Sequence, residues 1–537
     1  MKSASIKTSL VMTGAVLFNI IFWQEKLAVN TLLFDVFILA AVFYLYQPSF
    51  KRPVMRWLLL AHLVTVVTVI IHNTLLSKLA FSSTLLMVMV FTQFEHRSLW
   101  YAGASAVMNY ILVIPSFSSS IGQMKKGKHN FYNTKKVLRF VVIPIFILIV
   151  FSMLYSFSNA VFNEILNTVG LALEQFFSKF FDWFNISRLG FLLLGIFVTG
   201  GLLLKSNAGY FSKRDIEKQD KLNRKKNDLA KWKQTPFYDL LSLIMGRFAN
   251  GILALRNENT VGIISLVLLN LLLFFINWLD VVYVWFGFTY TQGINLTEYV
   301  HEGAGLLIFS IVLAMLVLLF FFRGNLNFYK KNKWLKIGAY VWIIQNIILV
   351  ISVFFRDYYY IHEYGLAYKR IGVLVFLTLV LAGLLTMYIK ISRVKTSYYL
   401  LKINAWVVLA VLVISSCVHW DETIANYNLS RKSALPLDVK FLLSLSDKTL
   451  PLLEKNQDVL TKTFINSPHN DEGEMYYRGQ LSAKEYFEQR KSAFFIEQKN
   501  YTWLSWNAAD NYVKQNLKEP SLITSKQQYA EPASQNK

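Results

Sequence analysis

Long apolar runs separated by short basic connections dominate the first 419 residues of the chain. Typical runs cover residues 10–23, 31–46 and 264–278. Because the bilayer core offers backbone groups no hydrogen-bond partner, runs of this kind are typical of transmembrane helices. The pattern therefore predicts an all-α fold, that of a polytopic helical membrane protein.

Twelve apolar windows are candidate spans, and the charges between them decide how many cross the membrane. They lie near residues 8–23, 29–47, 54–72, 78–93, 98–115, 137–160, 187–204, 260–286, 303–322, 334–354, 370–390 and 400–419. The positive-inside rule places the basic clusters at 51–56 and 125–136 on the same cytoplasmic side, so an even number of spans separates them. Three candidates lie between these clusters, and the weakest, 98–115, contains Asn109 and ends at Pro115. We interpret it as an interfacial helix, which leaves about 11 transmembrane helices.

This topology places the N-terminus in the cytoplasm and the C-terminus outside, in a bacterial inner membrane. The expected parts are an N-terminal membrane bundle (1–204) with interfacial helices near 98–117 and 161–186, a basic cytoplasmic loop (205–259), a second membrane bundle (260–419), a helical extracytoplasmic domain (420–518) and a disordered tail (519–537). The extracytoplasmic domain contains many apolar residues, among them Phe441 and Leu453, and is expected to pack on the external ends of the spans. Within it, Ser482 and Glu485 predict a capping box, and Asp447 is expected to cap a helix.

The positive charge belongs to the membrane part of the chain. Residues 1–419 contain 40 Lys and Arg against 17 Asp and Glu, whereas residues 420–537 contain 15 of each. A net charge of +23 would also suit a nucleic-acid-binding protein, but a chain that is 55% hydrophobic and 16% aromatic is not a soluble one. The single cysteine, Cys417, excludes an intrachain disulfide and a cysteine-based metal cluster.

Several local motifs in the second half of the chain occur in the order expected for one family. They are Tyr299–Gly303, Tyr360–Leu366 followed by Arg370, Ile424–Leu429, Leu437–Asp438 leading to Leu443–Ser446, and Trp503–Asn507. On these motifs the chain resembles a bacterial family of multi-pass membrane proteins, domain of unknown function four-one-seven-three, and its sister family four-one-five-three. The resemblance implies an integral membrane protein of undetermined activity and assigns no role to individual residues.

Ionisable residues of the second bundle fall on one external face in this topology. The candidate external polar site comprises Asp280, His301, Glu302, Arg356, Asp357, His362, Glu363 and Arg370. Charged groups near apolar spans are costly, so they are either paired structural residues or part of a ligand or proton site. For Asp280 both interpretations stay open. No catalytic residue and no cofactor are predicted. The pairs His301–Glu302 and His362–Glu363 could supply four metal ligands if their loops met, but adjacent helical residues point about 100° apart, so one pair does not chelate easily and no metal site is predicted.

The sequence favours a non-enzymatic envelope scaffold or sensor, whose partners are membrane lipids and another envelope protein, and not nucleic acid. A transporter of a small solute or lipid is one alternative, for which Asp35 is the acidic residue deep in an apolar run. A lipid-linked group transferase with an external site is the other. Phosphate-loop, dinucleotide and nucleophile-elbow motifs do not occur. The mixed-charge segment 213–226 reads as a solvated helix that either sets topology or binds anionic lipid.

Overall fold

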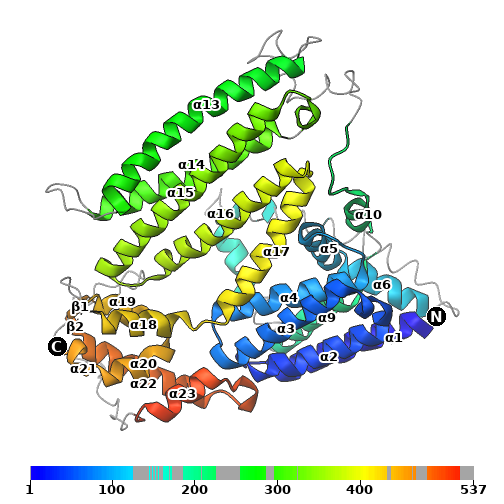
Figure 1. The fold of residues 1–537 in the computed structure, drawn as a ribbon. Coiled ribbons are helices and arrows are strands. Elements are labelled where there is room, and N and C mark those ends of the chain that lie inside the picture. The colour runs from blue at the N-terminus through cyan, green and yellow to red at the C-terminus, as the bar shows by residue number, and fades with distance from the viewer. Residues whose placement is uncertain are drawn as a thin grey trace.

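The computed structural model describes residues 2–124, 144, 148, 151–152, 155–156, 161–168, 170–171, 186–206, 209–224, 254–285, 296–322, 324–431, 437–461, 464–466 and 480–519. Over these residues the chain is an all-α, polytopic membrane protein with one pair of three-residue strands. Figure 1 shows two groups of long helices, with α17 running between them and the C-terminal helices gathered at one end.

Five helices form the N-terminal bundle: α1 (Lys2–Phe22), α2 (Val29–Tyr46), α3 (Pro53–His72), α4 (Leu75–Gln93) and α9 (Ile186–Leu203). Their inward faces share one apolar core, which includes Phe34 and Leu58. Capping residues define where α3 ends and α4 begins. Asn73 ends α3 with a left-handed φ of 49°, and Thr74 then caps α4 together with Ser77.

The second bundle contains α13 (Ala254–Asp280), the π-helical turn η3 (Val281–Trp285), α14 (Leu296–Phe321), η4 (Asn325–Phe328), α15 (Lys333–Tyr364) and α16 (Tyr368–Ser392). It has its own apolar core, which includes Leu318 and Val353. The next helix, α17 (Ser397–Ser416), packs on α16 but also contacts α3, α4 and α5 of the first bundle. Its Leu409 belongs to the core of the N-terminal bundle, so α17 joins two otherwise separate cores.

Nine described helices are long and apolar enough to cross a bilayer, and each coincides with a predicted span. The predicted span 303–322 lies in α14, whose apolar part, Gly305–Phe321, is shorter. The predicted span 137–160 lies almost wholly outside the described residues, as does most of the helix expected near 161–186. The window 98–115 is not a straight span, because α5 (Leu99–Ile111) and α6 (Val113–Met124) meet at an angle of 62°.

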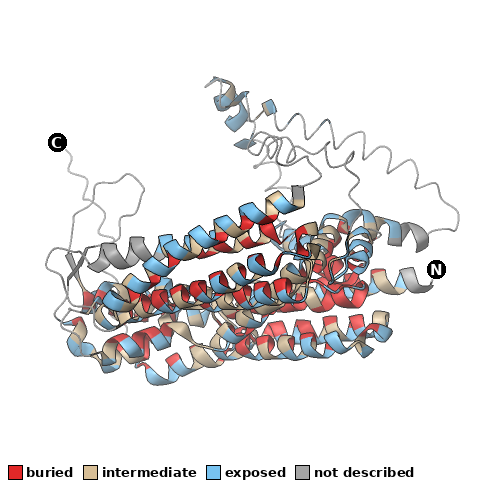
Figure 2. Cartoon of the chain, turned by 45° about the horizontal axis from the view of Figure 1, so that its top comes forward, coloured by how far each residue is buried: buried red, intermediate tan, exposed pale blue. Residues whose placement is uncertain are grey.

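The outward faces of the long helices are apolar. Figure 2 shows exposed residues along the outer sides of the helices and buried residues where helices face one another. On α13 the exposed residues include Leu271, Phe274 and Trp278, and on α15 they include Ile344 and Phe354. Apolar patches of this extent require cover in water, and lipid supplies it in a bilayer.

The described part of the C-terminal segment, which lies within residues 420–519, consists of short elements. They are α18 (Trp420–Ser430), α19 (Val439–Ser444), η5 (Asp447–Thr449), α20 (Leu450–Lys455), α21 (Gln457–Leu460), β1 (Phe464–Asn466), β2 (Gln480–Ser482), α22 (Ala483–Lys499), η6 (Trp503–Ser505) and α23 (Ala508–Asn516). β1 and β2 are antiparallel, and Ile465 is opposite Leu481. A third apolar core, with Leu442 and Phe487, holds the segment together and includes Ile371 of α16.

The two ends of the helical bundles carry different structures. We call the end at which turns 23–28, 73–74 and 364–367 meet the C-terminal segment the docking end. The other end holds the chain's N-terminus, η1 (Gln47–Lys51), α5 and α10 (Tyr210–Glu217) (Figure 1). We call it the basic end, because lysines and arginines are frequent in its connections.

Candidate functional site

The predicted polar site contains one buried ion pair. Arg356 Nη2 lies 2.5 Å from Asp280 Oδ1, and the two side chains are 7% and 6% exposed. Asp280 ends α13 and Arg356 lies near the docking end of α15, so the pair joins these helices. Asp357 is buried beside it, and one carboxylate oxygen of Asp280 and one of Asp357 have no hydrogen-bond partner among the described residues.

The other predicted site residues are placed differently. His362 and Glu363 contact each other at 3.2 Å, but their side chains are 63% and 44% exposed, away from the buried pair. Arg370 lies over the Tyr360 ring at 4.3 Å and donates to the carbonyl of Gly365. His301 and Glu302 belong to α14, and their side chains lie outside the described part. Within that part no group of three or more His, Cys, Asp or Glu could hold a metal ion.

Two of the family-like motifs bind each other. The Leu366 amide donates to Asn428 Oδ1 at 2.6 Å, and Asn428 Nδ2 donates to the Leu366 carbonyl at 2.9 Å. Gly365 precedes this contact with φ of +86°, and a Cβ there would lie 2.4 Å from Asn428 Oδ1. Tyr368 adds a hydrogen bond of 2.5 Å to Asp421 Oδ1. These hydrogen bonds fasten α18 to the α15–α16 turn.

A buried polar network lies halfway along the N-terminal bundle, where sequence analysis identified only Asp35. His62 Nε2 lies 2.8 Å from Asp35 Oδ1, and His62 Nδ1 lies 2.9 Å from Thr84 Oγ1. Thr65 Oγ1 completes the network, 2.8 Å from Thr84 Oγ1. All four side chains are almost fully buried. The repeat of His62, Thr65 and Thr68 at intervals of three on α3 is the sequence signal that could have revealed the polar face.

Charged and polar groups attach the C-terminal segment to the N-terminal bundle. Lys26 Nζ lies 3.1 Å from Glu497 Oε1 and 4.7 Å from the centre of the Tyr501 ring. Burial and the hydrogen bond to Glu497 raise the pKa of Tyr501 to about 12. The Lys26 amide donates to Ser505 Oγ at 2.7 Å, and Ser505 Oγ in turn contacts Glu25. Sequence analysis missed these contacts, which join residues more than 470 positions apart.

A half-buried lysine completes this attachment. Lys448 Nζ donates to the carbonyls of His72 and Asn73 at the end of α3, in both cases at 2.5 Å. Burial lowers the pKa of Lys448 to about 8. His419, the N-cap of α18, lies beside the His72 ring. Burial, and next the positive charge of Lys448, lower the pKa of His419 to about 4.

At the basic end, α10 is anchored by a buried carboxylate. Asp215 Oδ2 accepts hydrogen bonds from His96 Nδ1 at 3.0 Å and from the amides of Arg97 and Ser98, and Oδ1 accepts from Tyr398. Burial by itself would raise the pKa of Asp215, but these hydrogen bonds lower it overall. The carboxylate thus ties α10 to the α4–α5 turn and to α17.

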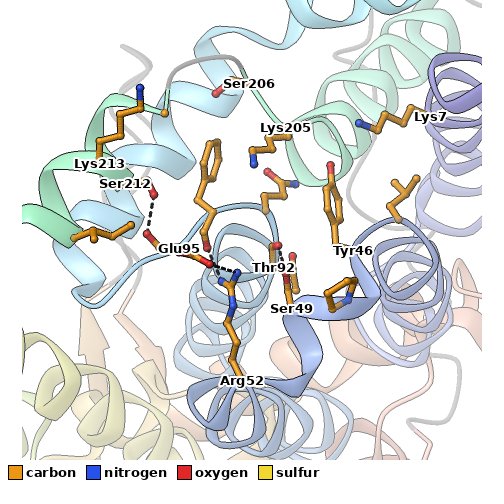
Figure 3. A pocket seen from close by; sticks show the side chains of 16 residues that line it. Lys7, Tyr46, Ser49, Arg52, Thr92, Glu95, Lys205, Ser206, Ser212 and Lys213 are labelled. Atoms are coloured by element: carbon orange, nitrogen blue, oxygen red, sulfur yellow. Dashed lines mark hydrogen bonds and ion pairs between the residues drawn. The ribbon is translucent and has the colours of Figure 1, made fainter. Parts of the chain in front are cut away.

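This anchored helix forms one wall of a cavity of about 830 Å³, shown in Figure 3. The cavity lies between the basic ends of α1, α2, α4 and α9 and the first turn of α10. Its described charged lining residues are Lys7, Arg52, Lys205 and Lys213 and one acidic residue, Glu95. Sequence analysis predicted basic connections here but gave no reason to expect a cavity.

The apolar helices and buried polar groups together define an integral, multi-pass α-helical membrane protein. Residues 11–456 match the family described as Domain of unknown function (DUF4153), so the chain belongs to that family. The family number four-one-seven-three expected from the motifs is therefore wrong, and the sister family is the right one. The match begins in α1, so the N-terminal bundle belongs to the family domain as well. No curated protein and no solved structure matches the chain.

Proposed function

We propose that this membrane protein is a non-enzymatic scaffold or sensor of the bacterial envelope. In this proposal the docking end faces outward, the basic end faces the cytoplasm, and the C-terminal segment meets a partner in the envelope. The observation that carries the proposal is the position of the C-terminal segment, which contacts both helical bundles at the docking end.

The two attachments of the C-terminal segment differ in chemistry. Toward the N-terminal bundle most of the described contacts are ionic or hydrogen-bonded, as between Lys26 and Glu497 and between Lys448 and the end of α3, and one apolar residue, Leu504, packs against the core of that bundle. Toward the second bundle they include apolar packing, because Ile371 of α16 enters the core of the segment. Polar contacts at a membrane surface can exchange partners for water at small cost, whereas apolar packing cannot.

In this proposal the C-terminal segment stays attached to the second bundle through apolar packing and can be released from the N-terminal bundle. The bundles have separate apolar cores, linked directly by α17. A partner that binds the C-terminal segment can therefore favour either the attached or the released state of the N-terminal bundle, provided that it binds the two states with different affinity. A scaffold would hold one state permanently, and a sensor would switch.

A disulfide lock tests the proposal, since Cys417 is the only native cysteine. In a Cys417→Ser background, Glu25→Cys with Ser505→Cys would join two side chains that touch across the attachment. For a sensor, oxidation should abolish the cellular function of the full-length protein and reduction should restore it. For a scaffold, oxidation should leave function intact.

Photo-cross-linking tests the partner. A photoreactive residue at Ile496, which is exposed on α22, should capture an envelope protein, and the same residue at Lys330 on the basic end should not. The absence of any envelope adduct from Ile496 would contradict both the scaffold and the sensor.

Transport is a second candidate, and the Asp35–His62 pair favours it. Ionisable residues inside a bundle are found along proton and ion pathways more often than in the lipid-facing parts of membrane proteins. If the pair carries protons, liposomes containing the full-length protein should show a potential-driven proton flux that Asp35→Asn abolishes. Equal fluxes in protein-containing and empty liposomes would count against proton coupling.

A further inference from the structure

The cavity at the basic end is lined by more positive than negative charge. Among the described residues Lys7, Arg52, Lys205 and Lys213 line it, against one acidic residue, Glu95. Arg52 lies 3.0 Å from Glu95, so this pair is internally neutral. The three lysines have no carboxylate within salt-bridge distance among the described residues. The cavity therefore keeps an excess of positive charge that an anion would neutralise.

Two of these lysines are held by aromatic rings and not by acids. Lys7 Nζ lies 5.9 Å from the centre of the Tyr46 ring, and Lys205 Nζ lies 4.9 Å from that of Phe94. Figure 3 shows both amino groups pointing into the space between the helices. A ring face positions an ammonium group without neutralising it, so both charges remain available to a ligand.

The cavity also offers hydrogen-bond donors. Ser206 lines it and is 2% exposed, and its hydroxyl has no hydrogen-bond partner among the described residues. The first turn of α10 begins at the cavity with Gly209, which has no side-chain oxygen to cap the helix. Among the described residues no side chain caps the first amides of α10, and uncapped amides at the positive end of a helix favour an anion with several oxygen acceptors.

We infer that this cavity binds a phosphate group, with Lys7, Lys205 and Ser206 as its principal ligands. A phosphate has the charge and the number of acceptor oxygens that this set of donors requires. Two sources can supply it: the headgroup of an anionic phospholipid, since the cavity lies where the spans end, or a soluble phosphate. A cavity of about 830 Å³ is far larger than a phosphate ion, which favours a headgroup with its glycerol backbone.

The test measures phospholipid binding to the full-length protein by native mass spectrometry. Phosphatidylglycerol, phosphatidylcholine and inorganic phosphate are offered in turn to the wild type and to the Lys7→Gln/Lys205→Gln variant. Removing two lysines should weaken phosphatidylglycerol binding about 25-fold, about fivefold for each charge. The control is Lys330→Gln/Lys331→Gln, which removes the same charge from exposed positions at the basic end outside the cavity.

The outcomes separate the two sources. Binding of phosphatidylglycerol that only the cavity variant loses, without competition from inorganic phosphate, supports the lipid headgroup. Binding of inorganic phosphate that the cavity variant loses supports a soluble ligand. If the cavity variant binds both as the control does, or if the wild type prefers phosphatidylcholine, the inference is wrong. Melting temperatures recorded without ligand show whether the cavity variant is folded. If it is not, Ser206→Ala replaces it in the same binding measurements, since this substitution removes a donor without changing the charge.

Discussion

At the scale of single residues, the Asp280–Arg356 pair shows how charge is accommodated at the end of a span. Removing one partner of a buried pair leaves the other charge uncompensated, which is far more costly than removing both. Asp280→Ala should therefore lower the free energy of unfolding by about 3 kcal/mol. Replacing both residues, as Asp280→Leu with Arg356→Met, should recover most of this loss. Thermal melting in detergent measures the three variants.

The same experiment separates the two interpretations of Asp280 that the sequence left open. A stable Asp280→Ala protein that has lost its cellular function would favour a ligand or proton site. A stable Asp280→Ala protein with normal function would show that Asp280 is neither a structural partner of Arg356 nor part of a ligand or proton site.

Gly365 is a second residue with a specific requirement. Its φ of +86° with ψ of −179° is a conformation that only glycine adopts readily. A side chain there would also collide with Asn428 Oδ1. Gly365→Ala should destabilise the protein by roughly 2 kcal/mol. The control is Gly372→Ala in α16, where an added Cβ meets no neighbour and the helix should gain stability. Equal melting temperatures for the two variants would contradict this reading of the turn.

His419 gives the attachment a pH dependence whose sign can be worked out. Its pKa is about 4 in the folded protein, against about 6.5 for an unfolded histidine. Between these values the unfolded chain binds more protons, so stability is complete above pH of about 6.5 and falls as the pH decreases toward about 4. The loss should reach roughly 3 kcal/mol, and His419→Gln should remove most of it. Melting curves at a series of pH values test this, and parallel pH profiles for the two proteins would argue against it.

At the scale of elements, local sequence signals predicted local structure well. Ser482 and Glu485 form the predicted capping box at the start of α22. The charge argument rejected 98–115 as a span, and the chain bends there at Leu112, which is compatible with a broken span as well as with a helix pair that does not cross. Its interfacial position stays a prediction. Asp447 was expected to cap a helix. In the structure it is the first residue of the 3₁₀ turn η5, Ser446 occupies the N-cap position, and the Asp447 carboxylate pairs with Arg490.

The signals that failed depend on residues far apart in the chain. Asp35 could be noticed as an acid in an apolar run, but its partner His62 belongs to another helix. The predicted external site grouped residues by topology alone. In the structure Asp280 and Arg356 of this group form an ion pair, whereas the side chains of His362 and Glu363 are exposed, and topology alone does not distinguish the two cases. Spacing along one helix reveals a polar face, whereas contact between helices depends on rotation and register.

The docking of η5 on α3 gives a prediction at this scale. Lys448 satisfies two carbonyl groups at the C-terminus of α3, where a positive charge also interacts favourably with the helix dipole. Lys448→Met keeps the apolar stem and removes the donors, so it should cost about 1–3 kcal/mol. Proteolysis should then release the C-terminal segment from the N-terminal bundle faster than in the wild type. The control is Lys455→Met, at the end of α20, for which no ion pair is found among the described residues. An unchanged cleavage rate for Lys448→Met would show that the lysine does not hold the segment in place.

At the scale of the whole molecule, the C-terminal segment depends on the bundles beneath it. Its apolar core includes Ile371 of α16, and Lys448 and Glu497 find their partners in the N-terminal bundle. Residues 420–518 expressed alone should therefore be poorly folded or aggregate, because these groups would meet water. A chain truncated after residue 519 should melt like the full-length protein. A monomeric isolated fragment that melts cooperatively would instead identify an independent domain.

The orientation of the molecule follows from its charge distribution and remains a prediction. Lys51, Arg52 and the basic residues of α10 lie at one end of the bundles, and the C-terminal segment, with its balanced charge, lies at the other. Positive connections are retained in the cytoplasm during insertion, so the docking end should face outward. Alkaline phosphatase fused after residue 430 should then be active, and the same enzyme fused after residue 225 or residue 125 should be inactive. Activity after both 225 and 430 would overturn the orientation. Activity after residue 125 would mean that α5 and α6 together cross the membrane. With the other predicted spans unchanged, the fusion after residue 225 would then be active and the one after residue 430 inactive, and the cavity lysines would have to be assigned to a side by their own fusions.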